Sequence, residues 1–442
     1  MKNSSLSVIT ADKLDDSFFS VRRLSDGLDE IPRILESVRA GGDRSVREAA
    51  ARFDRANPGQ LEVGACHLEA AAAKMKRENS ALYAAICRSR DLALAFAARQ
   101  RECFTDFTVE LDAGLVTGQR TLAVERAGIY VPAGRFPLLS TVIMCASPAR
   151  AAGVDEIIMC TPPVSAEAPW ADERILAAAW LCGVNRVFAI GGSQAIGAMA
   201  YGTETVPRVQ VIVGPGNRFV TAAKKYVYGE VGIDMLAGPS EVLIIADESA
   251  HPAWVAADLY AQAEHDPDAQ AVLVTTSADL AARVVAEVER LLAPLGENAP
   301  ARQSFRNHGT VILVSSLDEA VAIANRKCPE HLELAMNPSA ERDRMEAALR
   351  NFGSLFVGHR SAEVLGDYSA GLNHTLPTAG SASFTGGLSV RHFLKTVTTL
   401  RADDGGTRGA GVIASLEAAA VLAEAEGLSG HALAANIRLG SA

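Results

Sequence analysis

The sequence predicts an α/β fold with two Rossmann-like, three-layer domains on parallel sheets, plus N-terminal helices and a C-terminal helical tail. Three observations support this class. At 442 residues, the chain is too long for one ordinary hydrophobic core. Its hydrophobic content of 49%, with 21% charged residues, is typical of packed globular domains. From Gly128 onward, short apolar runs alternate with helical stretches, which indicates parallel β-α-β units.

The N-terminal part is predicted to be mainly helical over residues 28–101. Apolar residues recur at helical spacing from Ile31 to Val38, and Gly41-Gly42-Asp43 is expected to end that run. An alanine-rich stretch over 68–101 continues the helical pattern.

The first alternating block is expected to contain four strands, at 129–131, 156–160, 186–190 and 209–213. Helices are expected over 139–152 and 172–182, and also after the turns at Gly191-Gly192 and Gly214-Pro215-Gly216.

A second alternating block follows Asp234, with strands expected at 241–246, 271–275, 310–314 and 353–357. Residues 381–410 are rich in Gly, Ser and Thr, so an irregular connection is expected there. A last helix is expected over 411–426, with Gly427 as its stop.

Charge and cysteine usage exclude several classes of protein. A net charge of −10 argues against a nucleic-acid-binding protein, because such proteins present a basic face. No apolar run approaches the length of a membrane-spanning helix, and the N-terminus lacks the pattern of a signal peptide. Seven cysteines without a C-x-x-C pair suit reduced thiols, so a cytoplasmic protein is expected.

Two short segments carry candidate chemistry. If Ala261–Asp266 is helical, Gln262 and His265 leave the same face and could ligate one metal; the alternative is a capped helix end with a surface histidine. In the second segment, Glu330 and His331 follow Pro329, which suits a rigid loop or the start of a helix.

Two further segments are informative mainly by their order. Residues 366–377 are dominated by polar and turn residues, so a loop is expected, with Asp367 as an oxygen ligand and His374 as a substrate contact. Glu426 and His431 lie close to the C-terminus. Each segment alone is weak evidence for a site.

Taken together in this order, the segments resemble the histidinol dehydrogenase family over about residues 30 to 438. The resemblance also covers Gly128–Pro132, Gly191–Ile196, Val213–Asn217 and Asp234–Val242. So many ordered matches at matching spacings are specific, although no single one is.

The resemblance implies a role for each matching residue. Zinc would be held by Gln262, His265, Asp367 and His431, a set that leaves positions open for a substrate. His331 would be the general base, and Glu330 would activate water for the second oxidation. The substrate would be contacted by the four zinc ligands and His331, together with Ser240, His374 and Glu426.

The cofactor and the oligomeric state are also implied by the resemblance. NAD would be contacted by Tyr130, Gln194 and Asn217; the chain contains no G-x-G-x-x-G motif that would indicate NAD by itself. Family members are homodimers whose C-terminal tail completes the neighbour's site. The division expected is a helical part of the first α/β domain (1–127), the NAD-contacting α/β domain (128–236), the remainder of the first (237–380), and the exchanged tail (381–442).

The expected reaction is oxidation of L-histidinol through histidinal to L-histidine by two hydride transfers to NAD. The alternative within the family is a paralogous dehydrogenase for another small diol or amino alcohol, such as dihydroxypropanesulfonate. Arg135 lies in a loop where the family usually has small residues, and it could either be a surface residue or attract such an anion. A non-catalytic binding protein is the third possibility, and a complete metal and base set argues against it.

Cys328 has two interpretations. It could form a thiohemiacetal with the aldehyde, or it could be a small core residue; the second is preferred because the family's mechanism does not require a thiol.

Overall fold

The computed structural model describes residues 6–20, 28–54, 56, 58–133, 137–402 and 409–440. The chain forms two compact units, residues 1–98 with 124–393 and residues 99–123 with 394–442. The first unit contains two six-stranded sheets, and the second contains a three-stranded sheet. Among the described residues, no helix combines the length and the apolar character needed to cross a membrane.

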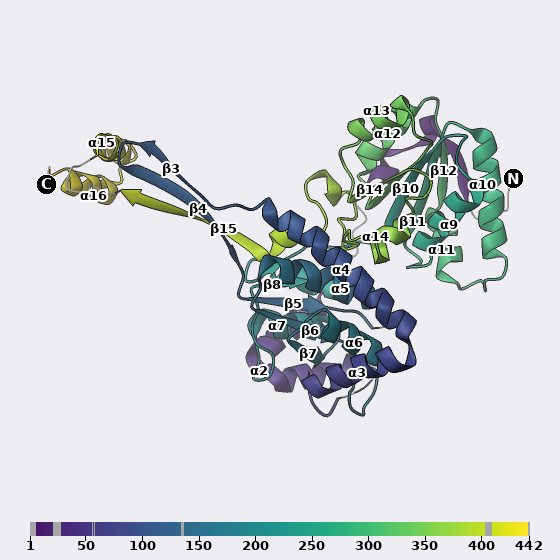
Figure 1. The fold of residues 1–442 in the computed structure, drawn as a ribbon, viewed down its shortest axis with the longest axis horizontal. Helices are drawn as coiled ribbons and strands as arrows, with labels where there is room; N and C mark the ends of the chain where they lie inside the picture. Colours follow the sequence, from purple (N-terminus) through teal and green to yellow (C-terminus); the bar gives the residue numbers. More distant parts are fainter. Residues whose placement is uncertain are drawn as a thin grey trace. The chain divides into compact units, whose positions relative to one another are not determined.

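One sheet of the first unit has the strand order β2-β7-β6-β5-β8-β9 (Figure 1). All neighbouring strands are parallel except β2, which runs antiparallel to β7. The strands are β2 (Glu62–Val63), β5 (Arg126–Tyr130), β6 (Glu156–Thr161), β7 (Arg186–Ala189), β8 (Val211–Val213) and β9 (Gly232–Ile233). After the roles that the family resemblance implies for Tyr130 and His331, we call this the cofactor-side sheet and the other sheet of the first unit the catalytic-side sheet.

Helices cover both faces of the cofactor-side sheet. Buried side chains of α2, α7 and α8 form one core with the strands, while α5 and α6 lie on the other face and α3 packs on α6. The helices are α2 (Glu30–Phe53), α3 (Ala65–Glu78), α4 (Ser80–Glu102), α5 (Leu139–Ala152), α6 (Glu173–Leu181), α7 (Gly192–Tyr201) and α8 (Arg218–Val227).

The other sheet of the first unit is parallel throughout, in the order β1-β12-β11-β10-β13-β14. Its strands are β1 (Ser7–Thr10), β10 (Glu241–Ala246), β11 (Gln270–Thr275), β12 (Thr310–Leu313), β13 (His331–Ala335) and β14 (Ser354–Val357). Every residue of β10, β11 and β13 is buried, as expected of central strands covered on both faces.

Two helical layers enclose the catalytic-side sheet. Helices α9, α10 and α11 form a core on one face, and α12 and α13 form a core on the other. The helices are α1 (Asp16–Phe19), α9 (Pro252–Ala263), α10 (Ala278–Leu292), α11 (Pro300–His308), α12 (Leu317–Lys327), α13 (Ala340–Ala348) and α14 (Glu363–Tyr368), with 3-10 turns at Ala11–Lys13, Ser381–Ser383 and Val390–Phe393.

The second unit is an antiparallel sheet followed by two packed helices. Its strand order is β15-β4-β3, and α15 packs against α16. The elements are β3 (Phe107–Asp112), β4 (Leu115–Ala123), β15 (Leu394–Ala402), α15 (Ala410–Ala425) and α16 (Ser429–Leu439). Large apolar side chains are exposed on both helices: Val421, Leu422, Leu433 and Ile437.

The structure corrects two local predictions. Gly42, with φ 52, interrupts α2 as expected, but the helix resumes and continues to Phe53. The predicted irregular connection over 381–410 was wrong in its middle, where Leu394–Ala402 forms β15. β15 is mostly exposed and pairs with a strand far away in the sequence, so it lacks the apolar run by which a buried strand is recognised.

Candidate active site and cofactor edge

The strand order reverses between β5 and β8 in the cofactor-side sheet. The chain passes from β5 through β6 to β7 in one direction, and then returns to place β8 on the other side of β5. In open α/β sheets, ligands bind beyond the carboxyl ends of the strands at such a reversal. Here Tyr130 ends β5, and Gly214 directly follows β8.

The turn after β8 has a constrained backbone. Gly214 has φ +114, and a Cβ at this position would overlap the carbonyl oxygen of Tyr130. Asn217 then caps α8, since its side-chain oxygen accepts hydrogen bonds from Phe219 N (3.0 Å) and Val220 N (3.2 Å). The turn therefore brings Gly214 against the end of β5 and places Asn217 at the start of α8.

Tyr130 and Gln194, both predicted to contact NAD, are connected through one turn. The hydroxyl oxygen of Tyr130 accepts from Gly192 N (3.1 Å), and Gln194 lies one turn into α7. Gln194 Nε2 donates to Asp54 Oδ2 (3.3 Å), a residue not predicted from the sequence. Burial raises the pKa of Asp54 to about 6, against the opposing effect of the Gly191 and Gln194 hydrogen bonds.

The predicted base lies at the edge of the catalytic-side sheet that is formed by the amino ends of its strands. His331 is the first residue of β13 and is paired in register with Val242 of β10. Glu330 Oε2 accepts from Glu241 N (2.9 Å), while His331 Nδ1 lies 3.3 Å from Glu241 O. Ser240 immediately precedes β10, so it lies at this same edge.

Carboxylates surround His331. Its Nε2 lies 3.5 Å from Asp367 Oδ1, and its Nδ1 lies 3.8 Å from Glu330 Oε2 and 4.0 Å from Glu363 Oε2. Burial alone would lower the pKa of His331, but these carboxylates raise it to about 10. Burial raises the pKa of Glu330 to about 8, although the nearby His331 opposes this rise. Glu330 can therefore exchange a proton close to neutral pH, whereas the surrounding carboxylates favour the protonated form of His331.

Asp367 lies close to three other predicted residues: His331, His374 and His265. The prediction of a loop over 366–377 was wrong at its start, because Asp367 lies in α14. Burial would raise the pKa of Asp367, but His331, His374 and His265 together lower it. His374 is partly buried, its Nε2 has no hydrogen-bond partner, and desolvation lowers its pKa.

Gln262 and His265 do not both lie in α9, whereas the prediction placed them on one face of a helix. The helix ends at Ala263, so His265 lies beyond it and is exposed, whereas Gln262 is buried. In the amide orientation that satisfies its neighbours, Gln262 donates to Glu363 Oε1 (3.0 Å) and Oε2 (3.1 Å) and accepts from Glu241 N (2.9 Å). Glu363 was missed, although its position one helical turn before Asp367 could have indicated a shared face.

The remaining predicted residues lie elsewhere. Glu426 ends α15 and His431 lies in α16; both are exposed on the second unit. Cys328 ends α12 in the left-handed conformation, its thiol donates to Asn325 O (3.1 Å), and burial raises its pKa, which favours the core interpretation. Arg135 lies outside the described residues. Among the described residues, no three His, Cys, Asp or Glu side chains form a cluster that could hold a metal ion.

Comparison with known proteins identifies the family. The sequence pattern of histidinol dehydrogenases matches residues 21–439. The chain belongs to the histidinol dehydrogenase family. Its relatives include the histidinol dehydrogenase of Dechloromonas aromatica, which is 44% identical over 414 residues and covers 92% of this chain and 91% of its own length. That of Aromatoleum aromaticum is 45% identical over 413 residues, covering 92% and 90%.

A solved structure of the family also confirms the fold. The crystal structure of histidinol dehydrogenase from Elizabethkingia anophelis aligns with a TM-score of 0.89 at 34% identity, covering 100% of this chain and 99% of that one. The predicted α/β class with parallel sheets, N-terminal helices and a helical tail is thereby confirmed, and so is the resemblance to histidinol dehydrogenases.

Proposed function

We propose that this histidinol dehydrogenase family member oxidises L-histidinol through histidinal to L-histidine, with NAD as hydride acceptor. The observation that carries the proposal is the buried His331–Glu330 pair beside Asp367 at one sheet edge. A dehydrogenase needs a positioned proton acceptor, and an oxidation that ends in an acid also needs a group that activates water. The two adjacent residues supply both.

His331 would remove the proton of the substrate's hydroxyl group while a hydride moves to NAD from the carbon that bears this group. In the second oxidation, Glu330 would take a proton from the water that adds to the aldehyde, and hydride again leaves for NAD. The pKa of Glu330, about 8, lies close to neutral pH, which suits a group that gains and loses a proton in each cycle. Ser240 and His374 would bind the substrate at this edge.

Zinc is proposed at Asp367, with Gln262 and His265 of the same chain and His431 supplied by a second copy, which would also supply the substrate contact Glu426. The fit is supported by the Asp367 carboxylate with the imidazoles of His265, His331 and His374 near it, and by the unpartnered Nε2 of His374. Bound zinc would act as a Lewis acid that orients the substrate's imidazole and amino nitrogens. It would also offset the negative charge of Asp367, which together with Glu330 and Glu363 raises the pKa of His331.

NAD is proposed to bind at the strand reversal between β5 and β8, contacted by Tyr130, Gln194 and Asn217.

A homodimer is proposed because apolar side chains of α15 and α16 are exposed, such as Leu433 at 54% and Ile437 at 54%. A cytoplasmic location is proposed from the biosynthetic role and from cysteines that are all unpaired. No observation in the described residues favours the sulfonate alternative.

The test compares L-histidinol with dihydroxypropanesulfonate, following NADH at 340 nm and identifying the product. We expect about two NADH per histidine formed from histidinol, and none from the sulfonate. Removing divalent metal with a chelator should abolish turnover, and added zinc should restore it. NADH formation from the sulfonate alone would contradict the proposal.

The role of His331 is tested with His331→Asn. Loss of the base should reduce kcat by about 100-fold or more while bound zinc stays near the wild-type amount. Glu330→Gln is the matched variant, and it should slow oxidation of supplied histidinal more than oxidation of histidinol. Equal loss of zinc and turnover in His331→Asn would show that His331 is a ligand or a structural residue.

A further inference from the structure

A buried ion pair lies beneath the turn at the carboxyl end of β8. Lys224 lies on α8 and Asp234 follows β9, and their side chains are 3% and 0% exposed. Lys224 Nζ donates to Asp234 Oδ1. The Met235 amide also donates to Asp234 Oδ1 (2.7 Å), so this carboxylate is held on two sides.

The pair holds both polar groups of one residue in the turn. Lys224 Nζ donates to Gly214 O (3.0 Å), and Gly214 N donates to Asp234 Oδ2 (2.8 Å). Gly214 is also the residue that lies too close to Tyr130 to carry a side chain. One cation and one carboxylate thus fix the peptide groups on either side of a glycine with φ +114.

Stability alone does not account for such a pair. Two well-packed apolar side chains usually stabilise a core as well as a buried ion pair does, because both charges lose their hydration. Directional bonds to the N–H and C=O of one glycine instead select one backbone conformation. Glycine has more accessible conformations than any other residue, so this is where such selection has the most effect.

We propose that Lys224 and Asp234 are positioning residues for the cofactor, which hold the Gly214–Asn217 turn in the conformation that binds NAD. The inference rests on the proposed NAD site at the β5–β8 reversal. The hydrogen bonds that hold the turn all come from the chain itself, so NAD binding does not have to order it. Weakening the pair therefore reduces NAD affinity more than it slows the reaction of the bound complex.

The test uses the double variant Lys224→Met/Asp234→Asn, which removes both charges and leaves neither one buried alone. NAD binding to the metal-free full-length protein is measured by calorimetry, and KM and kcat are measured with zinc. We expect the Kd and KM for NAD to rise about tenfold or more, with kcat and the KM for histidinol within about twofold of wild type.

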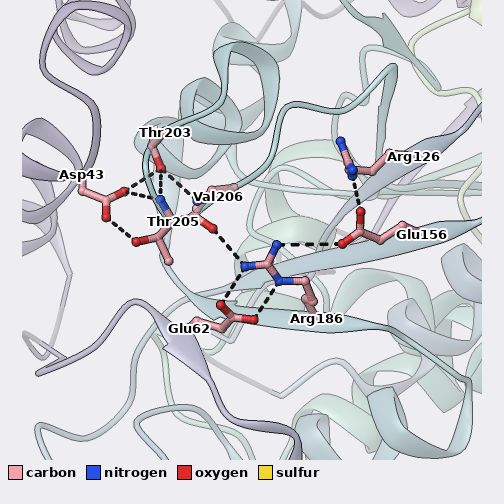
Figure 2. A network of polar contacts seen from close by, with 8 residues as sticks. All are labelled: Asp43, Glu62, Arg126, Glu156, Arg186, Thr203, Thr205 and Val206. Carbon is pink, nitrogen blue, oxygen red and sulfur yellow. Dashed lines mark hydrogen bonds and ion pairs between the residues drawn. The ribbon is translucent and has the colours of Figure 1, made fainter.

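The control removes an ion pair from the same sheet but at its opposite edge. Arg186 donates to Glu62 through Nε (2.7 Å) and Nη2 (2.7 Å) in a network beside the amino ends of β5, β6 and β7, as Figure 2 shows. Glu62→Gln/Arg186→Met should lower the melting temperature without changing the Kd for NAD.

The outcomes separate the inference from the proposed function. Wild-type affinity for NAD in the Lys224/Asp234 variant would overturn the inference, and so would a loss of stability with both KM values raised alike. If the double variant does not fold, Lys224→Gln/Asp234→Asn, which also leaves no charge buried alone and keeps a polar group at each position, is measured in the same way. A wild-type protein that binds no NAD would overturn the proposed function instead.

Discussion

Asp54 shows how a single residue can oppose stability where a ligand is expected to bind. Its carboxylate is largely buried beside Gln194 and the turn at Gly191, and burial raises its pKa from 3.8 to about 6. Because the folded-state pKa lies above the unfolded one, the protonated form is the stabilising one. Its contribution is complete below pH 3.8 and is lost as the pH rises through about 6.

Asp54→Asn should therefore raise stability at neutral and alkaline pH. At about pH 8 we expect a higher melting temperature, with a gain of at most about 3 kcal/mol, whereas at about pH 3.5 the variant and wild type should unfold alike. Thermal unfolding across this pH range is the measurement. A variant less stable than wild type at pH 8 would show that the Asp54 hydrogen bonds outweigh its desolvation.

The turn after β8 makes a prediction at the scale of an element. Gly214→Ala should destabilise the protein by several kcal/mol, because the added methyl group overlaps the Tyr130 carbonyl and φ is +114. Gly229→Ala is the matched control: φ is +107, but nothing lies within 4 Å of the added Cβ. Chemical denaturation of both variants separates the steric effect from the φ effect, and equal losses would exclude the steric one.

Elements whose signal is local were predictable from the sequence. The helix predicted over 139–152 is α5 (Leu139–Ala152), and the strand predicted at 241–246 is β10 (Glu241–Ala246). Both are apolar runs bounded by turn residues, so the local sequence is enough to recognise them. β13 was missed, since His331 and Glu333 place polar groups in a buried strand. Only the pairing with β10, from far away in the sequence, makes that segment a strand.

The candidate site also contains residues that were predictable from the sequence and residues that were not. His331, Glu330, Asp367 and His374 were predicted through the family resemblance, and the structure brings them together at one edge. Glu363 and Glu241 were missed, because their roles are contacts to Gln262 and Glu330 that depend on tertiary packing. Asp54 was missed for the same reason: it follows α2 and meets Gln194 only in the folded chain.

At the scale of the whole molecule, the proposal that a second copy supplies His431 can be tested by complementation. His331→Asn and His431→Asn should each be nearly inactive as homodimers. If His431 acts in trans, unfolding and refolding them together in equal amounts should restore about a quarter of wild-type activity, since half of the dimers then contain one complete site. Mixtures of either variant with itself are the controls, and activity that stays at the level of the separate variants would place His431 in its own chain's site.

The apolar residues exposed on α15 and α16 bear on the same proposal. Leu433 and Ile437 lie one helical turn apart on α16, so they share one face. A face of this kind is a common feature of subunit interfaces. In a homodimer that buries this face, the α15–α16 helix pair would supply both the subunit contact and the residues Glu426 and His431.

The pairing of His331 with Val242 also limits how this family can vary in length. Side chains alternate along β13, so His331 and Glu333 leave one face while Leu332 and Leu334 pack into the core on the other. One residue inserted between Cys328 and His331 would turn the imidazole into that core and a leucine toward Asp367. Insertions in this lineage are therefore expected beyond Asn337, where the chain has left the sheet and is exposed, and the spacing before β13 should stay constant.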